Sequence, residues 1–293
     1  MNSFYKTFIA LLLLVFSSIS LSQLNLSEIE FNTRYFEAVD KLVLVPTSID
    51  SEYFVGYIYL EPVVGFTLER MGILIVSGEE FKITETLEEL QMSLKIRIPD
   101  NANDMYLITP EQQNHLNIPP MPDWVPIYKK NSNDVSYLKE IGFEYNRVGA
   151  SSFALQPLTK AYSLQPDFEG LLYELAFAFN ATKQYAATID LLKKTIKTHK
   201  KNARILSEYG FALNQSNKVK EAESVYKKAL KYSNDDNLSI EICFNMIQAF
   251  YNSQNYKKFN YWVKKFDKRS PKDSPLINHV NFFKKQLRIL KCF

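Results

Sequence analysis

Three residue types recur together in the second half of the chain, at a spacing that could build a binding surface. In three successive copies, a glutamate precedes a phenylalanine by three residues and an asparagine follows it by three more. Residues three apart lie on nearly the same face of a helix, so each copy presents a carboxylate, a ring and an amide together. The predicted ligand-groove residues are Phe143, Asn146, Phe177, Asn180, Phe211, Asn214, Glu140, Glu174 and Glu208.

An apolar floor flanked by hydrogen-bonding groups suits an extended or helical peptide. Two other interpretations stay open, because aromatic residues at helical spacing are usually core. In one, each phenylalanine packs against the next repeat and each asparagine caps its helix. In the other, the N-terminal half of the chain covers the rings.

Lysines form a second recurring set, on the helix that follows each of these. The predicted basic face consists of Lys193, Lys194, Lys197, Lys227, Lys228, Lys231, Lys264, Lys265 and Lys268. A solvated outer helix face is the ordinary interpretation. The alternative is a basic strip for an anionic polymer or a membrane surface, whereas nucleic acid is not expected because no groove-reading motif is present.

Motifs for catalysis are absent from the sequence. It has no G-x-S-x-G elbow, no phosphate-binding glycine loop and no H-E-x-x-H. The adjacent carboxylates at 79–80 and 88–89 are typical of solvated surface rather than of an acid/base pair. His115, His199 and His279 lie far apart, without metal-ligand spacing. The sequence therefore predicts no enzyme, no metal site and no cofactor.

The recurring side chains need a scaffold with the same period. Gly142, Ala176 and Gly210 lie 34 residues apart, and an apolar residue precedes each of them. Small residues at the crossing of two antiparallel helices let the backbones approach closely. Gly149 and the pair at 216–217 supply turns between the helices. The pattern predicts stacked helical hairpins from residue 134 onward.

At these positions the chain resembles the tetratricopeptide repeat (TPR) family. The first unit matches at Leu138, Ile141, Gly142, Tyr145, Ala154, Leu158, Ala161 and Pro166. The resemblance implies four TPR-like repeats over 134–293, with the phenylalanine and asparagine positions facing a concave groove. A TPR groove that clamps a C-terminal carboxylate needs inward lysine or arginine, so the glutamates here argue against that mode.

Two units depart from the family pattern. Thr188 and Thr195 replace alanines in the second unit, which predicts a looser hairpin. The fourth unit, at about 240–273, is out of register by three residues and has Phe259 and Phe266 where alanines are expected, which predicts wider spacing. A capping helix is expected over 276–293, with its inward residues at Val280, Phe283, Leu287 and Leu290.

The N-terminal half has a different pattern. Gln91–Ile98 alternates apolar and polar residues, which predicts a half-buried strand, and other β-rich runs are separated by turn signals. We expect a β-rich, sandwich-like domain over 23–117 and a stiff, Pro-rich linker over 118–133. The predicted fold class is thus α+β with two domains, a small all-β domain followed by an α-solenoid of TPR helical hairpins.

The first residues resemble an export signal. Lys6 precedes an apolar run from Phe8 to Phe16, and small residues at Ser20 and Ser22 suit a cleavage site, so 1–22 is predicted to be a cleaved signal peptide. No cysteine lies near that point, so the chain is not expected to be a lipoprotein. We expect a secreted or periplasmic protein. Cys243 is expected to pack as a buried hydrophobe, and a bridge between it and Cys292 is left open.

Charge divides the chain sharply. Residues 23–133 hold 8 Lys/Arg and 17 Asp/Glu, a net −9, whereas 134–293 hold 26 and 15, a net +11. One hypothesis is therefore a self-docked sensor, in which the acidic half covers the basic half. The favoured hypothesis is a scaffold or adaptor whose groove holds a protein or peptide partner from the cell envelope or secretion machinery.

Overall fold

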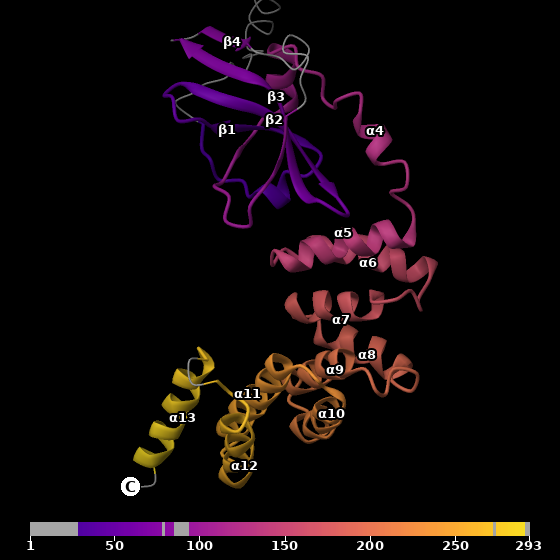
Figure 1. Ribbon diagram of the computed structural model, residues 1–293, viewed down its shortest axis with the longest axis vertical. Helices are drawn as coiled ribbons and strands as arrows, with labels where there is room; N and C mark the ends of the chain where they lie inside the picture. The colour runs from indigo at the N-terminus through magenta and orange to yellow at the C-terminus, as the bar shows by residue number, and fades with distance from the viewer. Residues whose placement is uncertain (1–28, 78–79, 85–93, 272–273, 291–293) are drawn as a thin grey trace, which may run out of the picture. The chain divides into compact units, whose positions relative to one another are not determined.

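The computed structural model describes residues 29–77, 80–84, 94–271 and 274–290 (Figure 1). The described residues form two compact units, divided between Lys130 and Asn131. The predicted signal peptide, the carboxylate pair at 88–89 and Cys292 lie outside the described residues.

The first unit is built on one antiparallel sheet. Its strands are β1 (Lys41–Pro46), β2 (Glu52–Glu61), β3 (Gly65–Ser77), β4 (Glu80–Thr84), β5 (Leu94–Arg97) and β6 (Tyr106–Leu107). The strand order is β4-β3-β2-β1-β6, and β5 also pairs with β3. Long β3 pairs with β5 through 67–70 and with β4 through 73–77. The described strands thus make one sheet, not the two sheets of the expected sandwich, because both short strands extend the edge of β3.

The alternating segment does form a strand, but only part of its expected buried side is covered: Ile98 is 5% exposed, whereas the two apolar residues before it are not buried. Leu94 and Ile96 are each 41% exposed. The side chain of Lys95 instead contacts aromatic rings, with Nζ 5.2 Å from the centre of Trp124 and 4.6 Å from that of Tyr128. Alternation predicts that two faces differ, but the packing partners decide which face is covered.

The segment predicted to be a stiff linker instead packs onto the sheet. Ile118 and Val125 are buried in the core of the first unit, and the Trp124 ring meets Tyr59 edge-on at 4.9 Å. One short helix, α3 (Pro110–His115), precedes this stretch, and another, α4 (Val125–Tyr128), lies within it. Prolines break regular structure, but they leave the apolar residues between them free to pack.

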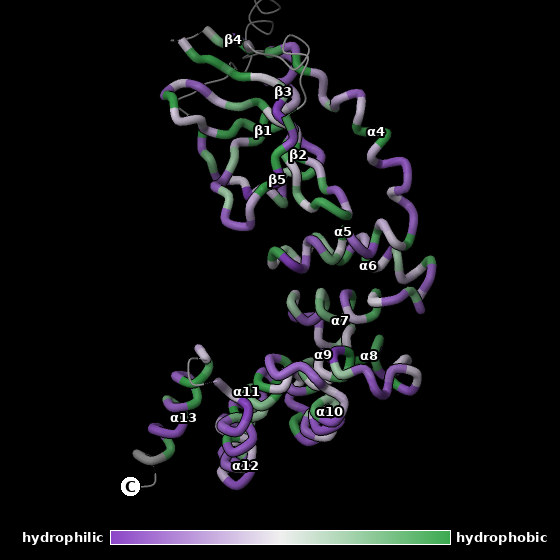
Figure 2. The backbone as a smooth tube through the Cα atoms, in the orientation of Figure 1, coloured by the Kyte–Doolittle hydropathy of each residue, from purple (hydrophilic) through white to green (hydrophobic). Residues whose placement is uncertain are grey.

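The second unit consists of helices that follow one another in antiparallel pairs (Figure 1). The pairs are α5 (Val135–Arg147) with α6 (Ser151–Leu164), α7 (Leu171–Ala181) with α8 (Tyr185–Thr195), α9 (Ala203–Gln215) with α10 (Val219–Tyr232), and α11 (Asp236–Asn252) with α12 (Tyr256–Asp267). A last helix, α13, spans Leu276–Leu290. Apolar and polar stretches alternate along these helices, as expected for helices that bury one face (Figure 2). An antiparallel sheet followed by a helical repeat region is therefore observed.

Equivalent turns mark the repeat directly. Gly149, Lys183, Asn217 and Gln254 each have a positive φ, of 76°, 61°, 60° and 53°, in the turn between the helices of a pair. They lie 34, 34 and 37 residues apart, so the last interval contains the three-residue shift expected from the sequence. A left-handed residue in each turn lets the chain reverse within a few residues.

The small residues occupy equivalent helix crossings. A Cβ added to Gly142 would lie 2.3 Å from Leu158, and one added to Gly210 would lie 2.7 Å from the ring of Tyr226. In both hairpins the facing residue is 16 positions further along the chain. At the same offset, Ala176 is buried in one cluster with Leu192.

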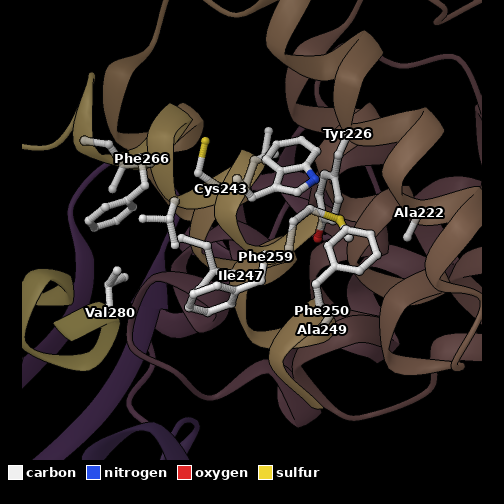
Figure 3. Packing of buried hydrophobic residues seen from close by; sticks show 14 of the residues in the cluster. Ala222, Tyr226, Cys243, Ile247, Ala249, Phe250, Phe259, Phe266 and Val280 are labelled. Atoms are coloured by element: carbon white, nitrogen blue, oxygen red, sulfur yellow. The ribbon is translucent and has the colours of Figure 1, made fainter. Parts of the chain in front are cut away.

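The departures from the repeat pattern are accommodated by burial. Thr188 is fully buried, and its hydroxyl donates to the Ala176 carbonyl at 3.5 Å, so its polar group has a partner. In the fourth pair, Phe259 and Phe266 are 2% and 1% exposed and fill the space where small residues were expected (Figure 3). Larger side chains at a helix crossing require greater separation of the helices.

The capping helix α13 joins the same core. Val280 and Leu287 are buried in the cluster that contains the fourth pair, and Val280 lies near Phe266 (Figure 3). Phe283 packs against this cluster, with its ring 4.6 Å from that of Tyr251. Cys243 is fully buried there, and burial raises the pKa of its thiol to about 11.

We expect Gly210→Ala to destabilise the protein, although alanine is the better helix former by about 1 kcal/mol. The added Cβ would lie 2.7 Å from the buried Tyr226 ring. Overpacking of this kind costs about 1 to 3 kcal/mol. Urea denaturation followed by circular dichroism measures the change.

The matched control is Gly210→Ala combined with Tyr226→Leu, which reproduces the pairing of Ala176 with Leu192. Tyr226→Leu should lower the free energy of unfolding less in this combination than it does alone, because the smaller leucine relieves the clash that Gly210→Ala introduces. An increase in stability from Gly210→Ala alone would contradict the close-approach argument.

Candidate functional site

A cavity of about 1030 Å³ lies along the first helices of the second, third and fourth pairs. Residues of α7, α9 and α11 line it, together with the turn before α8 and the segment that leads into α13. We call it the groove cavity. Its position on successive first helices matches the surface where the sequence places the recurring phenylalanines.

Two of the three predicted phenylalanines line the groove cavity. Phe177 comes from α7 and Phe211 from α9, both partly exposed. Phe143 of α5 does not line it, and its ring is 37% exposed. The ammonium of Lys139 lies 5.7 Å from the centre of the Phe143 ring and 2.8 Å from Glu140 Oε1. The first copy of the pattern therefore holds a lysine of this chain.

A fourth glutamate–phenylalanine pair also lines the groove cavity and was missed by the sequence analysis. Glu241 and Phe244 of α11 follow Glu208 and Phe211 by 33 residues. The turns of this unit are displaced by three residues, which would place the pair at 245 and 248, so the observed pair lies four residues, about one helical turn, earlier. The signal that could have found it is the unchanged three-residue interval between glutamate and phenylalanine.

Two of the predicted asparagines are hydrogen-bonded to two of the predicted glutamates. The Asn146 amide donates to the Glu174 carbonyl oxygen at 3.0 Å and to its Oε2 at 2.9 Å. Asn180 donates in the same way to Glu208, at 3.0 and 2.8 Å. We call these bonds the Asn–Glu ladder. It joins the first helices of successive pairs, so the amide donors of Asn146 and Asn180 are used within the fold, although Asn180 also lines the groove cavity.

Both ladder asparagines are 6% exposed, and their amide oxygens lack a hydrogen-bond partner among the described residues. The alternative interpretation expected each asparagine to cap its own helix, but neither amide does so. An asparagine that spans two helices uses its donor protons across the gap and leaves its oxygen enclosed.

The ladder stops at the third pair. The residue 28 positions beyond Asn214 is Ile242, whose side chain is fully buried. Asn214 instead lines a smaller hollow of about 350 Å³ with Gln248 and Asn252. The three-residue shift before α11 removes the glutamate that a third rung requires. Within the part of the chain that the structure describes, Glu241 therefore has neither an amide donor nor an ion-pair partner.

The protein environment raises the pKa of three carboxylates at or near the groove cavity. Burial raises the pKa of Glu208 to about 7, and Glu241 and Glu174 add to the rise, whereas the hydrogen bond from Asn180 opposes it. Burial also raises the pKa of Glu174. Glu241 is exposed to solvent, yet the surrounding protein raises its pKa, with a further contribution from Asp235. These groups would gain from a neighbouring cation.

The predicted basic face lies on the surface, on and just beyond α8, α10 and α12. Eight of its nine lysines are exposed and Lys265 is half-buried, so the set is a surface feature. The ring of Tyr261 has the ammonium groups of Lys227 and Lys265 at 5.6 and 5.3 Å. Lys227 also pairs with buried Glu223 at 2.9 Å, so part of the charge is already used within the fold.

The described residues contain no group of three or more His, Cys, Asp or Glu that could hold a metal ion. None of the helices found there has both the length and the apolar character needed to span a bilayer.

No family model matches the chain, and no curated protein matches it. Solved structures that resemble part of it include a crystal structure of MamA, at 20% identity and a TM-score of 0.42, covering 50% of this chain and 82% of that one. A second is MamA 41-end from Desulfovibrio magneticus RS-1, at 17% identity and a TM-score of 0.41, covering 49% and 76%. A likeness of this size carries no inference about function, which depends here on the groove geometry.

Asn180→Ala should destabilise the protein by about 1 to 3 kcal/mol, because it removes the amide donor of the Glu208 carboxylate and one of the bonds to the Glu208 carbonyl. Asn214→Ala is the matched control, since the Asn214 side chain makes no hydrogen bond within the described residues. It should change stability by no more than about 0.5 kcal/mol. Urea denaturation of both variants tests the ladder, and equal losses would contradict it.

Proposed function

We propose that the helical repeats form a TPR-type, non-catalytic scaffold that binds a segment of a partner protein in the groove cavity. The observation that carries this proposal is one cavity lined by phenylalanines from three successive first helices, Phe177, Phe211 and Phe244. Its volume of about 1030 Å³ lies at the upper end of the range for binding pockets, roughly 300–1,000 Å³.

The chemistry of the walls also supports a peptide. Backbone groups inside helices are already hydrogen-bonded, so recognition depends on side chains. Phe177, Phe211 and Phe244 offer apolar area along the groove, and the carboxylates and Asn245 offer polar contacts beside it. A helix or extended strand with apolar residues on one face matches such a surface.

Phe177→Ser with Phe211→Ser should reduce capture of the partner at least tenfold, because the double variant removes two of the three rings. The mature chain, which is the chain without the predicted signal peptide 1–22, is immobilised. Proteins captured from the envelope fraction of its own cell are quantified by mass spectrometry. Circular dichroism verifies that the variant is folded.

The matched control is Phe282→Ser, which removes a ring that is 55% exposed on α13 and does not line the cavity. It should leave capture unchanged. Capture that survives the double substitution but depends on other surfaces would count decisively against the groove.

We further propose that the protein is exported, secreted or periplasmic, and that its partner belongs to the cell envelope or secretion machinery. Support comes from Lys6, the apolar run from Phe8 to Phe16 and the small residues before Gln23.

In a secretion-competent host, the intact mass of the exported protein should correspond to a chain that begins at Gln23. Leu13→Arg interrupts the apolar run and should leave the chain uncleaved. A full-length wild-type chain would overturn export by cleavage.

A further inference from the structure

The first and fourth glutamate–phenylalanine pairs have the same spacing, but a lysine of the chain contacts only the first. In the first, the Lys139 ammonium contacts both Glu140, at 2.8 Å, and the Phe143 ring, at 5.7 Å. In the fourth, the residue before Glu241 is Ile240, which supplies no charge. The first pair thus shows the type of group that this arrangement of carboxylate and ring holds.

We propose that Glu241 and Phe244 bind a lysine or arginine side chain of the partner segment, in the way that Glu140 and Phe143 hold Lys139. This inference rests on the proposed groove binding and adds its specificity. The partner is therefore a cationic peptide that has apolar residues beside its basic one.

Charge complementarity selects this occupant. Glu208 and Glu241 both line the groove cavity, against one lysine, Lys183. Glu208 is already held by Asn180, whereas Glu241 has no partner among the residues described. A carboxylate at a cavity wall that lacks a cationic partner is stabilised when a cation enters beside it.

The walls fit the rest of such a side chain. Phe211 and Phe244 line the cavity together with Tyr185, and they can pack the aliphatic stem of lysine or arginine. An ammonium or guanidinium over a phenyl ring gains a cation–π attraction in addition to its ion pair. A neutral apolar side chain would fill the same space but leave Glu241 unpaired.

The test uses a phage-displayed library of random dodecapeptides, selected on the immobilised mature chain. We expect peptides that require Phe177 and Phe211 for binding and that are enriched in lysine or arginine. For a selected peptide, Glu241→Gln should weaken binding about tenfold, as should replacement of the critical lysine by neutral norleucine or of the critical arginine by neutral citrulline. The two changes together should cost little more than either alone, because they remove one interaction.

Glu221→Gln is the matched control, because this exposed glutamate lies on α10 and does not line the groove cavity. It should leave binding unchanged. Peptides that need the phenylalanines but show no basic enrichment, or that bind Glu241→Gln as tightly, would overturn the cation site and leave groove binding intact.

Two other outcomes are decisive. Failure to select any peptide that depends on the groove would overturn both proposals. Self-association of the mature chain that Glu241→Gln abolishes, measured by sedimentation, would assign the groove to a lysine of a second copy and overturn the separate partner.

Discussion

The close approach of paired helices at a small residue is the constraint on which the rest of the second unit depends. At Gly142 and Gly210 there is no room for a Cβ against Leu158 or Tyr226. Because each hairpin closes at an equivalent crossing, successive hairpins present their first helices in the same orientation. The recurring side chains can then line one continuous surface.

The Asn–Glu ladder is a consequence of that regular stacking. An amide side chain can span two helices only when their separation and register are the same at each step, as they are between α5 and α7 and between α7 and α9. Where the register changes by three residues, at α11, the ladder ends. The same shift removes a third rung of the Asn–Glu ladder. It also leaves the Glu241 carboxylate at the groove cavity without an asparagine donor.

Burial explains where sequence reasoning about the first unit failed. Alternation in 94–98 correctly indicates a strand, but Leu94 and Ile96 are exposed because an edge strand is covered only where other segments reach it. The proline-rich segment was expected to be a stiff linker, yet Ile118 and Val125 lie in the core. Proline content reports backbone restriction, whereas burial depends on which apolar surface lies nearby.

The sequence by itself determined the repeat, because small residues at a 34-residue spacing and turn residues between helices are local requirements of helix pairing. It also determined which residue types recur on the first helices. Only the tertiary structure decided what those residues do, since Asn180 and Glu208 find each other across 28 positions of chain. Whether a polar group is satisfied within the fold or left for a ligand depends on the neighbours that packing brings, and a register shift of three residues changes them.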